Sequence, residues 1–398
     1  MAKIYHAHLW GSREDKYRYL LENDVNTVEW TEVNPEPPFY LFIPQNTDLF
    51  SEYEQYFKIT DIMPVNVLGF QTHRDDFSID FDREELHKRI AEMLDQNISD
   101  EKYYQKYNIK DSRDWKLREA RQNLQNDSAW EDKLITCLYR PFDWRYCYYS
   151  TVAMDYPRRE LINHVAGKEN LCLGLGRQGI AVNDLMWYLI QVSNKPIDAN
   201  VFRRGGINVF PLYLYPETDK PKELQQEKRP NFSPDFLKSL ESKLGYIPTP
   251  EAIFYYIYAI FHSPTYRQRY GEFLKIDFPR VPLTSNQQLF QDLGEKGQEL
   301  VELHLMQSPK LNKFITKIGG GGDNAVTEVT YKPTEERVYI NKTCYFEGIT
   351  PTLWQFKIGG YQVLDKWLKD RKKAKRNLSF DEMLHYQKIV VEIGRAHV

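Results

Sequence analysis

Three long segments, rich in Trp, Tyr and Pro, constrain the fold of this chain more than any other feature. Residues 139–149 (Tyr-Arg-Pro-Phe-Asp-Trp-Arg-Tyr-Cys-Tyr-Tyr) lie in a stretch that predicts strands. Residues 261–282 predict a short helix that opens at Ser263, followed by an extended arm that ends at Pro282. Residues 358–371 begin with Ile-Gly-Gly-Tyr and lead into a predicted helix. The sequence therefore predicts an α+β protein with a strand-rich core flanked by helices.

Bulk composition bounds the class of protein. A chain of 398 residues is expected to form two or three domains, and 41% hydrophobic residues indicate a folded protein. The net charge of -3 argues against a chain that is basic throughout, but a local basic cleft can still bind phosphate. The four cysteines lack metal-site spacing, which predicts free thiols in a reducing cytoplasm. No signal peptide and no membrane-spanning window is evident, so we expect a cytoplasmic protein with no membrane partner.

The three segments resemble the C-terminal specificity region of the single-chain restriction-modification enzymes called type ISP, which are similar to type IIG enzymes. The resemblance covers about residues 2–391. Members of this phage-defence family join a nuclease, a helicase-like motor, an adenine-specific (N6) methyltransferase and a target-recognition region. The resemblance implies that this chain recognises a sequence in double-stranded DNA through a strand-rich target-recognition core. The other domains would act in cis or as a separate subunit.

The motifs of catalysis are missing. Residues 34–39 (Asn-Pro-Glu-Pro-Pro-Phe) differ from the methyltransferase motif Asn-Pro-Pro-Tyr/Phe, because Glu36 precedes the two prolines and cannot supply the amide donor. No Walker A sequence occurs, and Asp82, in an acidic stretch, is better explained as a helix cap than as a nuclease residue. We expect a fragment that is not catalytic alone and holds no cofactor or metal. AdoMet, Mg²⁺ and ATP are implied only for the full-length enzyme.

Two alternatives come from other functional classes. Residues 174–179 (Gly-Leu-Gly-Arg-Gln-Gly) fit the dinucleotide pattern GxGxxG and follow a strand-like run, with Asp198 further along. A stand-alone nucleotide-binding enzyme is one alternative, although no succession of βα units surrounds the pattern. An interaction scaffold without a DNA role is the other, favoured if the arginines pair with acidic neighbours.

The predicted organisation has five parts. An N-terminal α/β connector (1–135) precedes a strand-rich recognition core (136–217), a polar linker (218–233) and a helical C-terminal part (234–391). The last seven residues, 392–398 (Glu-Ile-Gly-Arg-Ala-His-Val), match the conceptual translation of a sequencing adapter and are expected to break the preceding helix. We predict that they are an artefact, and no function is placed on His397. Strands are expected at 39–43, 65–70, 137–149, 170–175, 209–215, 327–331 and 337–341, and helices at 83–96, 114–125, 234–244, 250–261, 287–307, 360–372 and 379–391.

The residues that could read DNA lie on short loops and at one helix end. Arg suits the guanine edge and Asn or Gln the adenine edge, whereas Arg and Lys also bind phosphates. Arg177, Gln178 and Arg203 are the best base-reading candidates. For the loop that contains Gln71, Thr72 and Arg74, a turn held by Asp75 is an equal explanation. Asp143 is predicted to brace the fold by pairing with a nearby Arg. The predicted DNA-binding residues are Gln71, Thr72, Arg74, Arg140, Arg145, Arg158, Arg159, Arg177, Gln178, Asn183, Arg203, Arg204, Lys372 and Lys373.

Overall fold

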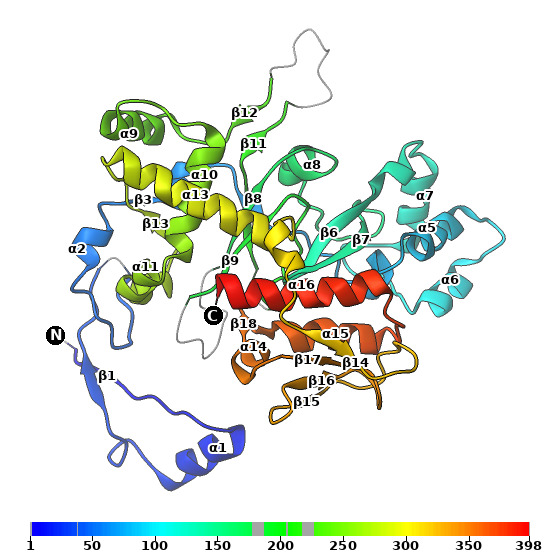
Figure 1. The fold of residues 1–398 in the computed structure, drawn as a ribbon, viewed down its shortest axis with the longest axis horizontal. Helices are drawn as coiled ribbons and strands as arrows, with labels where there is room; N and C mark the ends of the chain where they lie inside the picture. Colours follow the sequence, from blue (N-terminus) through cyan, green and yellow to red (C-terminus); the bar gives the residue numbers. More distant parts are fainter. Residues whose placement is uncertain (1, 38, 177–186, 204–205, 217–226, 398) are drawn as a thin grey trace. The chain divides into compact units, whose positions relative to one another are not determined.

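A computed structural model describes residues 2–37, 39–176, 187–203, 206–216 and 227–397 (Figure 1). The chain forms two compact units, Met1–Tyr53 and Glu54–Val398. All the predicted domain boundaries fall inside the second unit. None of the helices in the described ranges is long and apolar enough to cross a membrane.

The first unit is a small hairpin with one helix. Strand β1 (Ile4–His6) pairs antiparallel with β2 (Thr31–Val33), and α1 (Arg13–Glu22) lies between them in the sequence. The strand predicted at 39–43 does not form. Instead, the Tyr40 amide donates to the Glu36 carbonyl at 2.9 Å and closes a turn, with Tyr40 in a left-handed conformation. This unit ends in α2 (Phe50–Tyr53).

A four-stranded antiparallel sheet forms the centre of the second unit. Its order is β4 (Val67–Leu68), β10 (Asn208–Pro211), β8 (Cys172–Leu175) and β9 (Ile190–Ser193). All residues of β8 and β9 are buried, as expected for strands covered on both faces. Strand β9 was not predicted, because its alternating run Ile-Gln-Val-Ser is only four residues long.

A second sheet carries the first of the three sequence segments. It has the order β5 (Ile79–Asp80), β7 (Asp143–Tyr148) and β6 (Leu134–Arg140). Strands β6 and β7 form a hairpin, with Leu134 opposite Tyr148, where one strand-like stretch was predicted at 137–149. Helices α5 (Arg83–Ala91), α6 (Asp100–Tyr107) and α7 (Leu117–Gln125) pack beside it around Phe77 and Trp115 (Figure 1). Asp82 caps α5 as predicted, by accepting from the amides of Glu84 and Glu85.

The helices of the C-terminal part largely match the prediction. Helix α9 is Pro234–Leu244, and Thr249 caps α10 (Pro250–His262) through the Ala252 amide. Helix α10 packs closely on α13 (Gln287–His304), and α15 (Val363–Lys373) precedes α16. The predicted helix end at 391 is wrong: α16 (Phe380–Ala396) continues, with Glu392 and Ile393 fully buried. The reason is that Ile393 continues the apolar spacing of the preceding turns.

Part of the predicted linker is ordered and buried. Residues 217–226 lie outside the described residues, but β12 (Arg229–Pro230) pairs with β11 (Tyr213–Leu214). The buried Asn231 side chain donates to the carbonyls of Val65 and Pro211, at 2.8 and 3.0 Å. The remaining elements are β3 (Phe57–Lys58), α3 (Ile59–Ile62), α4 (Asp75–Ser78), α8 (Arg159–Val165), α11 (Pro264–Arg269), α12 (Gly271–Leu274), β13 (Arg280–Val281), β14 (Lys317–Gly319), β15 (Thr330–Lys332), β16 (Arg337–Tyr339), β17 (Tyr345–Glu347), α14 (Pro351–Gln355), β18 (Lys357–Ile358) and β19 (Tyr361–Gln362).

Candidate nucleic-acid interface

The loop that carries the candidates Gln71, Thr72 and Arg74 is held by its own polar side chains. Thr72 is buried, and its hydroxyl donates to the Asp75 carboxylate. The Arg74 side chain is 8% exposed, pairs with Asp155 at 2.6 Å and lies over the Trp115 ring. Asp75 therefore holds this turn, as the structural alternative predicted. In this structure Thr72 and Arg74 have protein partners, and their DNA contacts stay a prediction.

The arginines of the β6–β7 hairpin are buried in ion pairs. Arg140 donates to Asp198 at 2.9 Å, and Arg145 contacts both Asp143 and Asp370, at 2.6 and 2.8 Å. The predicted bracing role of Asp143 is confirmed. The sequence separation of these partners explains why pairing with Asp198 and Asp370 was not foreseen. The DNA contacts of Arg140 and Arg145 also stay a prediction.

Burial and the neighbouring positive charges shift the pKa values of these carboxyl groups in opposite directions. Burial alone would raise the pKa of Asp143, but the two neighbouring guanidinium groups outweigh it and lower this pKa well below its usual range. For Asp198 burial dominates and raises the pKa to about 6, in spite of Arg140. The hairpin is thus braced by charges that water does not reach.

The adjacent candidates Arg158 and Arg159 differ: Arg158 binds another candidate, and Arg159 is exposed. Arg158 donates to the Gln71 side-chain oxygen at 2.9 Å and to the Gly69 carbonyl at 3.3 Å. Arg159 is the first residue of α8; it is exposed and forms no ion pair with any residue that the structure describes. Arg159 is therefore available to a phosphate, whereas Arg158 orients Gln71.

Arg203 is exposed and held in place by the third sequence segment. It has a φ of 91° and no ion-pair partner within the described ranges. A Cβ at Gly360 would lie 2.5 Å from Arg203 Cδ, so the Arg203 stem lies directly on Gly360. The Gly360 amide also donates to the Phe202 carbonyl at 3.1 Å. The sequence analysis missed this supporting role of Gly360, although the Gly-Gly pair was a signal for close backbone approach.

Gly176, which directly precedes the candidates Arg177 and Gln178 in the sequence, lies close to Phe202, the neighbour of Arg203. A Cβ at Gly176 would lie 3.0 Å from the Phe202 ring, so the chain leaves Gly176 beside the Arg203 loop. Arg177, Gln178, Asn183 and Arg204 themselves lie outside the described residues.

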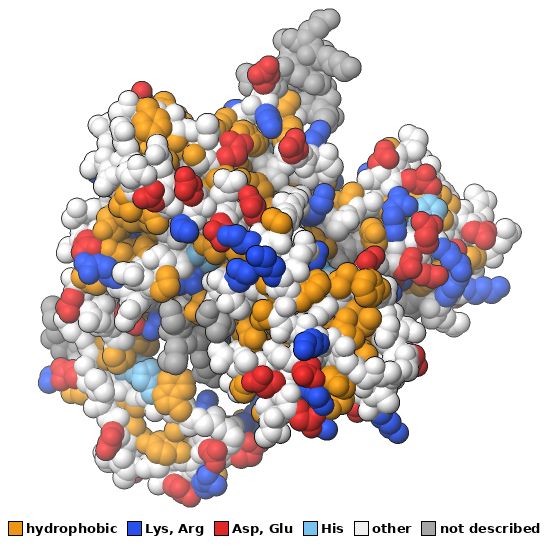
Figure 2. Space-filling model, in the orientation of Figure 1, with side chains coloured by type: hydrophobic (Ala, Val, Ile, Leu, Met, Phe, Trp, Pro, Cys, Tyr) orange, Lys and Arg blue, Asp and Glu red, His pale blue; other side chains and the backbone are white. Residues whose placement is uncertain are grey.

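The two lysines at the end of α15 differ in their surroundings. Lys373 pairs with Asp76 at 3.2 Å, with both side chains highly exposed. Lys372 is exposed, with no ion-pair partner in the described part of the chain. A pocket of about 590 Å³ brings Lys373 together with Arg74 from the first loop. On the face shown in Figure 2, acidic and basic side chains are interspersed.

The nucleotide-binding alternative does not fit the topology. Gly174 lies inside β8, which has antiparallel neighbours on both sides, whereas the dinucleotide fingerprint belongs to parallel βαβ units. A Cβ at Gly174 would lie 2.4 Å from Ile207, so this glycine serves strand packing. The buried Asp198 accepts hydrogen bonds from Arg140 and from the Asn200 amide through its Oδ1 atom.

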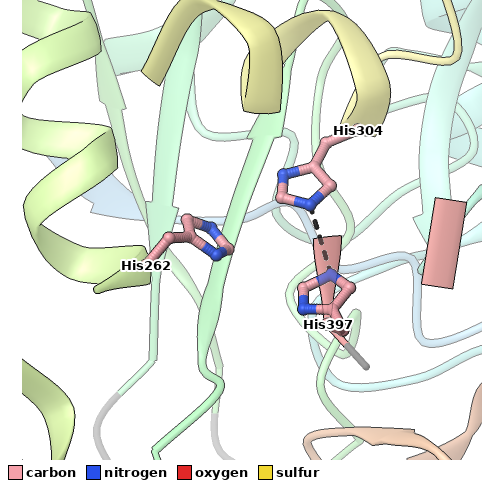
Figure 3. Close-up of side chains that lie close together, drawn as sticks. All are labelled: His262, His304 and His397. Atoms are coloured by element: carbon pink, nitrogen blue, oxygen red, sulfur yellow. Dashed lines mark hydrogen bonds between the residues drawn. The ribbon is translucent and has the colours of Figure 1, made fainter. Parts of the chain in front are cut away.

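Three imidazoles lie together at the end of α16 (Figure 3). His262, His304 and His397 have ligand atoms within 4.8 Å of one another. The Arg267 guanidinium lies 3.0 Å from His262, however, and a cation at this place opposes metal binding. His304 is also hydrogen bonded to Tyr258. Since His397 belongs to the predicted adapter-derived segment, no metal centre is assigned.

One family model matches most of the chain. The family described as Type ISP C-terminal specificity domain matches residues 61–395. No curated protein matches the chain.

Solved structures share the fold over nearly the whole chain. One is a nuclease-deletion mutant of the Type ISP restriction-modification enzyme LlaGI with a DNA substrate mimic, with a TM-score of 0.70, 18% identity, and coverage of 99% of this chain and 38% of that chain. The ATP-dependent Type ISP enzyme LlaBIII bound to DNA has a TM-score of 0.69, 19% identity and coverage of 92% and 25%. The DrdV–DNA complex has a TM-score of 0.70, 18% identity and coverage of 98% and 42%. This chain thus spans less than half the length of each neighbour, and it belongs to the family of Type ISP C-terminal specificity domains.

Proposed function

We propose that this chain recognises a specific sequence in duplex DNA on behalf of an adenine-N6 methyltransferase and restriction nuclease. The chain belongs to a family of specificity domains, and its three structural neighbours are complexes with DNA or with a DNA substrate mimic. AdoMet, Mg²⁺ and ATP would bind the other parts of such an enzyme, which acts in the cytoplasm. The fragment supplies recognition alone.

The exposed Arg203 is the observation that carries this proposal. Its stem is fixed on Gly360, while its charged group has no ion-pair partner among the described residues. An Arg whose stem is already packed loses less conformational entropy when its guanidinium bonds the guanine O6 and N7 atoms, and such a bidentate pair discriminates against other bases by about 1–3 kcal/mol. Arg159 and Lys372 would bind phosphates, which strengthens binding without regard to sequence.

The test is selection of bound duplexes from a random pool. The full chain is mixed with the pool at low salt, and the retained fraction is sequenced. An enriched asymmetric motif that contains adenine is the expected result. Retention that falls steeply with salt and shows no enrichment would reject base reading by this chain alone. An absence of retention at every salt concentration would reject DNA binding.

Single substitutions distinguish residues that recognise bases from residues that bind phosphates. Arg203→Ala is expected to abolish enrichment at one position of the motif, whereas Lys372→Ala should weaken binding to all sequences equally and reduce the salt dependence by about one phosphate contact. Lys238→Ala, on the exposed face of α9, is the matched control and should behave as the unchanged chain. Unaltered enrichment in Arg203→Ala would remove Arg203 from the site.

A further inference from the structure

The first unit exposes an unusual amount of apolar surface. Among the residues that the structure describes, eighteen large hydrophobic side chains are exposed, and eleven of them lie between Tyr5 and Ile43. Figure 2 shows hydrophobic side chains gathered on the surface of this unit, at the lower left of the view. A soluble protein rarely leaves such a concentration open, and large exposed apolar patches mark interaction surfaces. The eleven are Tyr5, Trp10, Tyr17, Leu20, Leu21, Val25, Trp30, Phe39, Tyr40, Phe42 and Ile43.

Helix α1 presents the clearest face. Tyr17, Leu20 and Leu21 are spaced so that they lie on one side of the helix, and their exposed fractions are 59%, 61% and 87%. No residue of α1 is buried. A helix normally buries the face on which its apolar residues gather, so this face lacks the surface that would cover it.

The unit also lacks a core of its own. Val33 and Tyr53 are the only buried hydrophobic residues in its described part. Its sheet consists of β1 and β2 alone, and an isolated two-stranded hairpin is marginally stable in water. These elements need another surface to become stable.

Charge identifies the class of partner. Residues 1–53 contain four Lys or Arg and nine Asp or Glu, a net charge of -5, whereas the whole chain carries -3. DNA and anionic lipid surfaces both repel a segment of this charge. Exposed Trp and Tyr with acidic neighbours fit a protein surface that is apolar and basic.

The structural neighbours are much longer than this chain. Their matches extend over 92–99% of this chain, and so reach into the first unit, but they span 25–42% of the neighbours' chains. More than half of each neighbour therefore lies outside the match and is available to cover this face. We propose that the exposed apolar face of residues 5–43 is the docking surface for the adenine-N6 methyltransferase domain that acts with this specificity domain. The inference rests on the proposed function.

The experiment measures binding of the methyltransferase itself. The probe is the polypeptide that carries Asn-Pro-Pro-Tyr/Phe and is encoded directly upstream of Met1 or in an adjacent gene, purified as a separate chain. Titration calorimetry with the full specificity chain is expected to show a one-to-one complex. The double variant Leu20→Glu/Leu21→Glu should weaken this complex at least about tenfold. Since both leucines are exposed, the variant should keep the melting temperature of the unchanged chain.

The control is Leu289→Glu, an equal change at an exposed leucine (45%) on α13 in the second unit. It should leave the affinity for the methyltransferase unchanged. Equal affinity of the α1 double variant, or the lack of any complex with the methyltransferase, would overturn the proposal. So would the lack of such a methyltransferase at either genetic position. A dimer of the specificity chain that the double variant converts to monomer in sedimentation would assign the face to a second copy instead.

DNA selection on the same proteins separates the two proposals. A chain that binds the methyltransferase but retains no DNA would reject the proposed recognition and leave the docking surface in place. A chain that enriches a motif but does not bind the methyltransferase would reject the docking surface and leave the proposed recognition in place.

Discussion

Arg371 Nη2 on α15 lies 2.9 Å from Asp143 Oδ1 on β7, with side chains that are 5% and 2% exposed. Arg145 lies between the same aspartate and Asp370, at 2.6 and 2.8 Å. Residues 139–149 and 358–371, two of the three segments that stand out in the sequence, therefore meet in one buried ion-pair cluster. The cluster fixes the β6–β7 hairpin against α15, whose last turn carries Lys372.

Removal of the central carboxylate should destabilise the fold strongly. Asp143→Asn leaves Arg371 buried without its counter-charge, which is expected to lower the free energy of unfolding by about 3–5 kcal/mol. Equilibrium unfolding in urea measures this loss. Asp76→Asn breaks an exposed pair with Lys373 and is the control, with an expected change within about 0.5 kcal/mol. Similar values for the two variants would show that the buried cluster contributes no stability.

The same cluster predicts that the stability of the fold decreases at acidic pH. Burial would raise the pKa of Asp143, but Arg145 and Arg371 lower it below the value of the unfolded chain. Its stabilising contribution is therefore present above the unfolded pKa of about 3.9 and is lost as the pH falls below it. The difference in stability between the unchanged chain and Asp143→Asn should stay constant from about pH 7 to pH 5 and shrink below about pH 4. A difference that grows on acidification would contradict the assigned pairing.

Two glycines of α13 should respond in opposite directions. A Cβ at Gly297 would lie 1.8 Å from the Tyr255 carbonyl oxygen of α10, so Gly297→Ala must push two packed helices apart, at a cost of about 1–3 kcal/mol or more. At Gly294 the nearest atom would be 3.9 Å away, and Gly294→Ala should stabilise the helix by up to about 1 kcal/mol. Thermal melts of both variants test this packing; equal melting temperatures would refute it.

Gly360 connects packing with recognition. Gly360→Ala places a methyl group against the stem of Arg203 and should displace this side chain, because the guanidinium end is exposed and free to move. We expect loss of sequence enrichment close to that of Arg203→Ala, with retention of stability within about 1 kcal/mol. Gly271→Ala, with no atom within 4 Å of the new Cβ, is the control and should leave both properties unchanged. Normal enrichment in Gly360→Ala would show that the position of Arg203 does not matter for reading.

Local sequence determined the helices with strong end signals. Thr249-Pro250 predicted the start of α10, because a capping hydroxyl and a proline at the first position act within one turn. The strand character of residues 137–149 and their resemblance to the family were also evident from the sequence. Helix α1 was not predicted, because its apolar face consists only of Tyr17, Leu20 and Leu21, within about one turn of a helix of ten residues.

The sequence by itself determined the family, the α+β class and the set of basic residues from which recognition is drawn. Only the tertiary structure decided which of those residues are free. Arg74, Arg140 and Arg145 are buried in ion pairs, whereas Arg159, Arg203 and Lys372 are exposed without ion-pair partners among the described residues. The physical reason is that a charge is neutralised by whatever lies within a few ångströms, and the Arg145 partner Asp370 is 225 residues away along the chain.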